Sequence, residues 1–63
     1  MQNKPKCKLI GEDGNVFNLI GIVNSTLKKA GMKEKAKEFT AKAFNCKSYD
    51  EVLQLIQEYV DVK

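Results

Sequence analysis

The side chains that most often carry out enzyme chemistry are scarce in this sequence of 63 residues. It contains two cysteines, eight acidic residues and no histidine, which is the usual general base near neutral pH. Cys7 is the best placed nucleophile, because Lys6 and Lys8 flank it. In an alternating strand, however, both lysines would point away from the thiol, and no neighbouring side chain could act as its base. We therefore expect no catalytic residue and no enzymatic activity.

The two cysteines, Cys7 and Cys46, also bear on metal binding and on cellular location. A structural zinc site takes about four ligands. Without histidine one chain offers two thiolates, although a dimer could assemble four. We find no charged start followed by an apolar run and a small-residue cleavage site, the pattern of a secreted protein. Nor does any apolar run approach the length that spans a bilayer. We expect reduced thiols in a cytoplasmic protein, with no cofactor, metal or membrane partner.

Lysine is the most frequent ionisable residue, since the chain has eleven lysines and no arginine. Residues 1–47 carry ten lysines and four acids, whereas residues 48–63 carry one lysine and four acids. The first part is therefore positively charged and the second part negatively charged. The candidate anion contacts are Lys28, Lys29, Lys33, Lys35, Lys37 and Lys42. Because base recognition favours the forked guanidinium of arginine, nucleic-acid binding through these lysines would be weakly sequence-specific. A solvated lysine face without a ligand is the simpler alternative.

The run of residues 9–14 (LIGEDG) is similar to the loop with which KH domains clamp single-stranded nucleic acid. Here the two residues between the glycines are Glu12 and Asp13, and their negative charges would repel a phosphate. The similarity ends soon after this loop. An ordinary turn before a helix therefore explains the glycines better than a nucleic-acid clamp does.

An alternating pattern near the start of the chain predicts a short β-strand. Residues 1–5 are polar and without periodicity, so we expect a disordered start before a single domain of residues 6–63. In residues 6–10 (KCKLI), lysines alternate with apolar residues at the period of a half-buried strand. A lone strand is not stable. Its partner is either the C-terminal tail, residues 60–63 (VDVK), or the same strand of a second subunit.

A turn-rich segment, residues 11–15 (GEDGN), separates this strand from a helix. Its last residue is a suitable N-cap, and apolar residues recur at helical spacing over residues 16–30 before Gly31 ends the helix. The alternative is a hairpin that pairs residues 7–10 with residues 16–20. The helical spacing continues well beyond a usual strand length, which favours the helix.

Two further helices are expected. From Lys33 to Phe44, small apolar residues form a stripe among lysines. The run Ser48-Tyr49-Asp50-Glu51 is a capping box, in which Ser48 bonds the amide of Glu51 and Glu51 reaches back to the amide of Ser48. The helix that follows carries apolar residues over more than the usual stripe. We therefore predict a mainly α fold, with a short N-terminal β-strand followed by a compact three-helix domain.

The size of the chain points to a partner. A domain of this length buries only about 60% of the surface that its unfolded form exposes, and it is often stabilised by a second subunit. The excess apolar face of the third helix could meet such a partner through Leu55, Tyr59 and Val62. We expect a small protein–protein interaction module, and a homodimer is its simplest assembly. The alternative function is a weakly sequence-specific nucleic-acid-binding protein that uses the lysine-rich helical face.

Residues 8–17 (KLIGEDGNVF), 28–31 (KKAG), 48–51 (SYDE) and 58–60 (EYV) together resemble a group of small uncharacterised bacterial proteins found in phages and mobile elements. The resemblance spans nearly the whole chain. It carries no known activity, so it assigns no functional residue. It implies an accessory protein that binds and modulates or inhibits a larger host protein, with host-defence machinery among the candidate targets.

Overall fold

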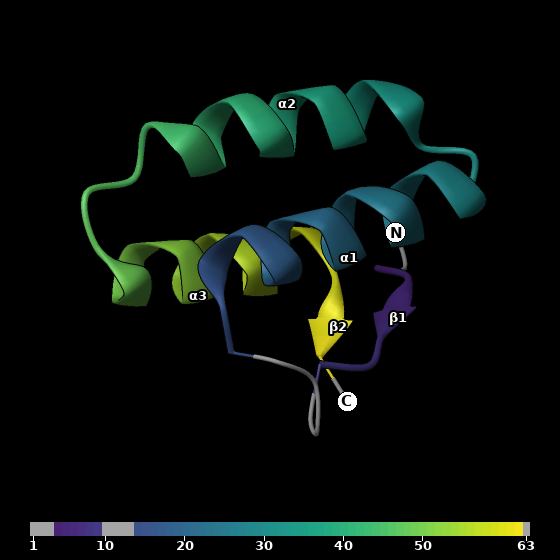
Figure 1. Ribbon diagram of the computed structural model, residues 1–63. Helices are drawn as coiled ribbons and strands as arrows, with labels where there is room; N and C mark the ends of the chain where they lie inside the picture. Colours follow the sequence, from purple (N-terminus) through teal and green to yellow (C-terminus); the bar gives the residue numbers. More distant parts are fainter. Residues whose placement is uncertain (1–3, 10–13, 63) are drawn as a thin grey trace.

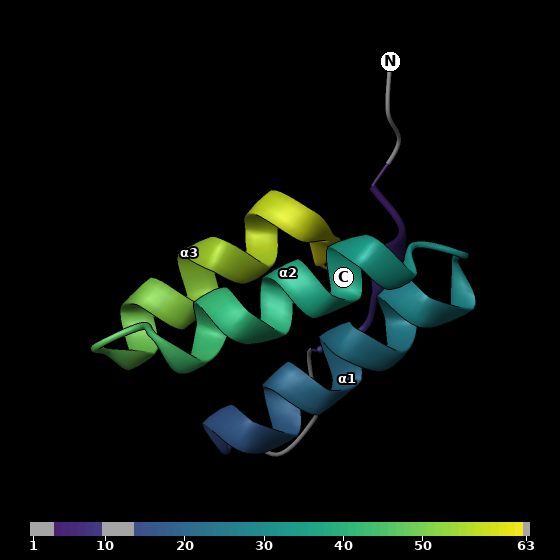
Figure 2. The same ribbon diagram turned by 90° about the horizontal axis from the view of Figure 1, so that it is seen from above.

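The computed structural model describes residues 4–9 and 14–62, and this part of the chain is mainly helical. Its elements are β1 (Lys6–Cys7), α1 (Val16–Lys29), α2 (Lys33–Phe44), α3 (Tyr49–Tyr59) and β2 (Asp61–Val62). Figure 1 shows α2 above α1 and α3, with the two strands below the helices. Seen from above, α2 lies between the other two helices (Figure 2). The predicted fold class, a short N-terminal strand and a compact three-helix domain, is confirmed.

Local signals set both ends of α1. The side chain of Asn15 accepts a hydrogen bond of 2.8 Å from the amide of Phe17, as the predicted N-cap requires. At the other end Gly31 adopts a φ of 77°, which is accessible to glycine at little cost. The amides of Gly31 and Met32 donate to Lys28 and Leu27, which is the Schellman arrangement. The hairpin alternative is wrong, because residues 16–20 are helical.

The capping box before α3 is confirmed in one half and corrected in the other. The Ser48 hydroxyl accepts from the amide of Glu51 at 3.2 Å, as predicted. The Glu51 carboxylate, however, accepts from the amide of Lys47, also at 3.2 Å, and not from that of Ser48. The bond to Lys47 lies one residue before the position that a capping box uses, so it holds the α2–α3 connection close to the start of α3.

The strand pairs with the C-terminal tail of its own chain. The two-residue ladder is parallel, with Lys6 opposite Asp61 and Cys7 opposite Val62. This strand is shorter than the predicted 6–10, and position 10 lies outside the described residues. The amide of Asp61 also donates to Pro5 at 2.9 Å. Pro5 therefore takes part in the contact between the start of the chain and its tail, and residues 1–3 of the expected disordered start, residues 1–5, lie outside the described part.

The core lies where the inward faces of the helices meet the strand pair. Phe39 of α2 is fully buried, and its ring meets that of Tyr59 edge to face at a centroid distance of 5.4 Å. The other buried apolar residues are Cys7, Leu19, Ile20, Val23, Leu27, Ala36, Ala43, Val52, Leu55, Ile56 and Val60. No helix among the described residues combines the length and the apolar character needed to cross a membrane.

Candidate functional site

The apolar face predicted for partner binding is not exposed. Leu55 and Tyr59 are only 9% and 8% exposed, and both belong to the core. Val62 is 36% exposed and lies on β2, apart from the helical stripe. The prediction that Leu55 and Tyr59 form a partner-binding face together with Val62 is therefore wrong. The apolar residues of α3 cover a wide part of the helix because it packs against α2, α1 and β2. The surface predicted to form a homodimer is therefore internal.

The exposed large apolar side chains gather mainly at another place. Phe17 is 66% exposed, Phe44 is 60% exposed and Tyr49 is 45% exposed. They come from the start of α1, the end of α2 and the start of α3. The rings of Phe17 and Phe44 lie 6.1 Å apart between centroids, tilted by 37°. Helices α1 and α2 run antiparallel side by side (Figure 1). The start of α1 therefore lies near the end of α2, and Phe17 and Phe44 form one exposed aromatic pair.

This pair borders an apolar depression that we call the aromatic pocket. It has a volume of about 280 Å³. Its lining consists of Val16, Phe17, Ile20, Ala43, Phe44, Cys46, Lys47, Ser48, Tyr49 and Val52. Most of these side chains are aliphatic or aromatic, and the one charge, that of Lys47, stands among them. Such a site suits a bulky apolar side chain of a ligand.

The sequence itself indicates that Phe17 is exposed, although the spacing of the core residues does not show it. Residues that follow Phe17 at helical intervals on its own face are Gly21, Asn24 and Lys28, and none of them is a core residue. A phenylalanine on a polar stripe is expected to face solvent. Phe44 stands at the end of a similar stripe on α2, after Lys33, Lys37 and Thr40.

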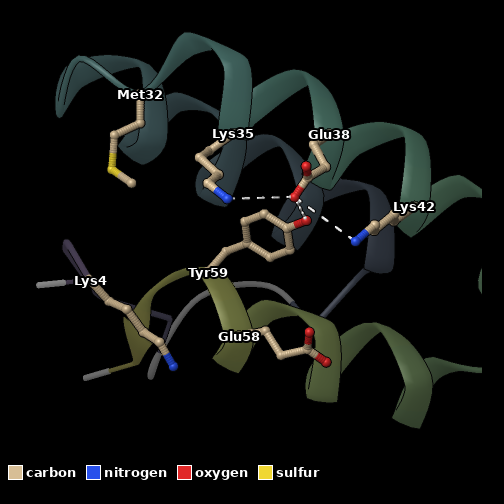
Figure 3. A pocket seen from close by; sticks show the side chains of 7 residues that line it. All are labelled: Lys4, Met32, Lys35, Glu38, Lys42, Glu58 and Tyr59. Carbon is tan, nitrogen blue, oxygen red and sulfur yellow. Dashed lines mark hydrogen bonds and ion pairs between the residues drawn. The ribbon is translucent and has the colours of Figure 1, made fainter. Parts of the chain in front are cut away.

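The six candidate anion-contacting lysines do not form one surface. Lys28, Lys33 and Lys37 line an open groove between α1 and α2, together with Asn24, Thr40 and Ala41. We call this depression, of about 750 Å³, the lysine groove. Lys29 lies on another side of α1. Lys35 and Lys42 face α3 and belong to a different cluster (Figure 3).

That second cluster joins α2 to the end of α3. Figure 3 shows Tyr59 rising from α3 towards α2, where its hydroxyl donates to the carboxylate of Glu38. The ammonium groups of Lys35 and Lys42 each lie 3.9 Å from the same carboxylate oxygen. Lys42 also stands 5.9 Å from the centroid of the Tyr59 ring. On the other side, Lys4 donates to the backbone carbonyl of Gln57 at 2.8 Å.

The ionisation of this cluster does not suit acid–base catalysis near neutral pH. Burial raises the pKa of Tyr59, and the hydrogen bond to Glu38 raises it further. That bond, followed by the charge of Lys35, lowers the pKa of Glu38. Hydrogen bonding with Tyr59 raises the pKa of Lys42. Each shift moves a group away from neutrality, so we interpret the cluster as a clamp between two helices.

The clamp predicts how stability depends on alkaline pH. Tyr59 and Lys42 hold their protons more tightly in the folded chain than in the unfolded one, so their stabilising effect is complete at neutral pH. It is lost as the pH rises through their folded-state pKa values. In a Tyr49→Phe variant, tyrosinate absorbance reports Tyr59 alone. We expect Tyr59 to ionise above the pKa of a tyrosine peptide, and the free energy of unfolding to fall over the same range of pH. Ionisation at the peptide's pKa, with the helices intact, would contradict this assignment.

The two thiols have different surroundings. Cys7 is buried and accepts a hydrogen bond of 3.4 Å from the Thr26 hydroxyl. Cys46 is partly exposed in the wall of the aromatic pocket, and its thiol lies 3.4 Å from the backbone carbonyl of Lys42, to which it donates. Within residues 4–9 and 14–62, no group of three or more histidine, cysteine, aspartate or glutamate side chains could hold a metal ion.

Comparison with known proteins identifies no relative of this chain. No protein-family model, no curated protein and no solved structure matches this chain. The exposed aromatic pair and the pocket beside it are consequently the features that best indicate a function.

Proposed function

We propose that this chain is a small protein-interaction module that binds a larger protein through the aromatic pocket. The observation that carries the proposal is the exposed pair of Phe17 and Phe44, with Tyr49 at the other side of the same depression. Three of the five aromatic side chains are exposed there, whereas the other two, Phe39 and Tyr59, are buried. Contiguous apolar surface of this kind marks interaction sites on small soluble folds.

The chemistry of the pocket supports a protein as the ligand. Aromatic side chains dominate the free energy of protein–protein binding where they surround an apolar pocket and exclude water from it. Seven of the ten residues that line the pocket are aliphatic or aromatic, so it offers few hydrogen bonds to a polar ligand. The resemblance to small proteins of phages and mobile elements supports a larger bacterial host protein as the partner, with defence machinery among the candidates.

A double variant tests this proposal. Phe17→Ser together with Phe44→Ser is expected to abolish capture of the partner from a lysate of the bacterial host. Both side chains are mainly exposed, so we expect the variant to lose no more than about 1 kcal/mol of stability, from the contact between the two rings. The matched control is Val62→Ser, which removes an exposed apolar side chain on β2. The measurement is the amount of partner that each immobilised variant retains.

The opposite pattern would overturn the proposal. If Val62→Ser lost the partner and the double variant kept it, the binding face would lie at the strand pair. Sedimentation of the same proteins shows whether the retained partner is a second copy. A dimer that dissociates in the double variant would make the aromatic pocket a contact between identical chains.

A further inference from the structure

The aromatic pair and the lysine groove lie on one continuous face of the α1–α2 pair. On α1, Phe17, Gly21, Asn24 and Lys28 follow one another at intervals of three or four residues, so they form one stripe. Their neighbours on α2 form the matching stripe Lys33, Lys37, Thr40, Ala41 and Phe44.

Contacts between the helices join these stripes along their length. Phe17 meets Phe44 at one end, and the Thr40 hydroxyl donates to the Asn24 side chain at 3.3 Å in the middle. Lys28 and Lys33 line one groove at the other end.

The lysines of this face lack acidic partners. No carboxylate in the described residues lies within 4.0 Å of the ammonium groups of Lys28, Lys33 or Lys37, whereas Lys35 and Lys42 both contact Glu38. Helix α1 contains no acidic residue, and none lines the lysine groove. Three exposed positive charges therefore converge on one depression without neutralisation, and an anionic ligand would complement them.

The middle of the face allows close approach. Gly21 lies one turn after Phe17, and a Cβ atom added to it would meet nothing within 4 Å. A glycine inside a helix costs about 1 kcal/mol relative to alanine, and packing within this chain does not explain it. Ala41 and Thr40 are also small. Gly21 also lines the depression on the Lys29 side of α1, so it lies at the edge of the face between its aromatic end and its lysine end. That edge can accept the backbone of a ligand.

We infer that the segment recognised here is an acidic amphipathic helix of the partner protein, with an apolar side chain in the aromatic pocket and carboxylates over Lys28, Lys33 and Lys37. This inference rests on the proposed function. The stripe from Phe17 to Lys28 is about 16 Å long, which matches about three helical turns. Docking of an amphipathic helix into a groove between helices is a recurrent mode of peptide recognition.

Two other occupants fit the face less well. A second copy docked through the same face would set lysines against lysines, because the lining of the lysine groove and the whole of α1 contain no acidic residue. The acidic residues nearest to them on α2, Glu34 and Glu38, do not line the groove. A nucleic-acid strand would satisfy the lysines and could stack a base on an exposed ring, but the pocket beside the rings is lined mainly by aliphatic and aromatic side chains. A leucine or phenylalanine side chain complements that lining better than the polar edge of a base.

The test is an unbiased peptide selection followed by binding measurements. A display library of random peptides of about 16 residues, enough for three turns and both ends, is selected on the immobilised protein. We expect enriched sequences to carry apolar residues spaced by three or four near one end and an excess of aspartate and glutamate towards the other. Binding of the most enriched peptide, followed by fluorescence anisotropy, should weaken as salt is raised.

Two charge variants locate the carboxylate contacts. Lys28→Gln/Lys33→Gln/Lys37→Gln should weaken binding of the enriched peptide about tenfold and remove most of its salt dependence. The matched control Lys6→Gln/Lys8→Gln/Lys35→Gln removes the same charge from other exposed positions and should change the affinity less than about twofold. Loss of binding in Phe17→Ser/Phe44→Ser is expected for both this inference and the proposed function.

Several outcomes would overturn the inference. They are a failure of any peptide to enrich over bare support, enrichment of neutral or basic peptides, and equal affinity for the two charge variants. A thymidine oligonucleotide that binds more tightly than the enriched peptide, and is lost in the lysine-groove variant, would assign the face to nucleic acid. Neutral peptides that require Phe17 and Phe44 would leave the proposed function standing, whereas binding unaffected by Phe17→Ser/Phe44→Ser would remove the proposed function as well.

Discussion

Phe39→Ala is expected to lower the free energy of unfolding by about 3–5 kcal/mol. Phe39 is fully buried, and its ring meets Tyr59 edge to face across the α2–α3 contact. Truncation of a buried phenylalanine to alanine costs about 3–5 kcal/mol. A domain of 63 residues has a total stability of about 3–9 kcal/mol, so this one change removes a large part of it. Urea unfolding followed by circular dichroism measures the loss.

A second phenylalanine on the same helix provides the control. Phe44 is 60% exposed, and its ring contacts only one other ring, that of Phe17. Phe44→Ala should therefore lower the free energy of unfolding by less than about 1 kcal/mol, since alanine is also the better helix former. Equal losses for Phe39→Ala and Phe44→Ala would show that the face of α2 turned towards the core has been assigned wrongly.

Val60→Asp is the second change with a large expected effect. Val60 is 1% exposed and follows α3 in extended conformation, where it joins the helix to β2. A carboxylate at this place would be buried without a partner, at a cost of about 3–5 kcal/mol. Burial would raise the pKa of the new aspartate. Its folded form then binds a proton more readily than the unfolded form, so the destabilisation should shrink as the pH falls below neutrality.

Val62→Asp is the matched substitution two residues further along. Val62 is 36% exposed on β2, so a carboxylate there stays in water and should cost less than about 1 kcal/mol. Thermal unfolding at neutral and mildly acidic pH compares the two variants. A loss for Val62→Asp as large as that for Val60→Asp would contradict the assignment of Val60 to the core and Val62 to the surface.

Helices α1 and α3 could be predicted from the sequence because local chemical signals bound them, whereas α2 begins without a side-chain cap and is indicated by its apolar spacing alone. Asn15 caps α1, Gly31 adopts the left-handed conformation that ends it, and the Ser48 hydroxyl caps α3. These groups act over three or four residues, so short-range spacing reveals them. The direction of the strand pair could not be derived in this way. It depends on where α3 delivers the tail, and tertiary packing decides that.

The site was harder to predict than the fold. The wide apolar face of α3 is compatible either with a partner protein or with several neighbours within the chain. Here α3 packs against α2, α1 and β2, and Leu55 and Tyr59 are buried. The lysines were predicted as one surface, yet the turn at Gly31 and the phase of each helix direct Lys37 and Lys42 to different sides of α2. Such separations follow from three-dimensional packing and not from composition.

Site-specific photo-crosslinking tests the central claim most directly. A photoreactive phenylalanine analogue is placed at position 44 in the aromatic pocket or at position 62 on β2, and the protein is irradiated in bacterial cells that produce it. We predict a covalent adduct with a larger protein from position 44 and none from position 62. An adduct from position 62, with none from position 44, would contradict the assignment of partner binding to the aromatic pocket.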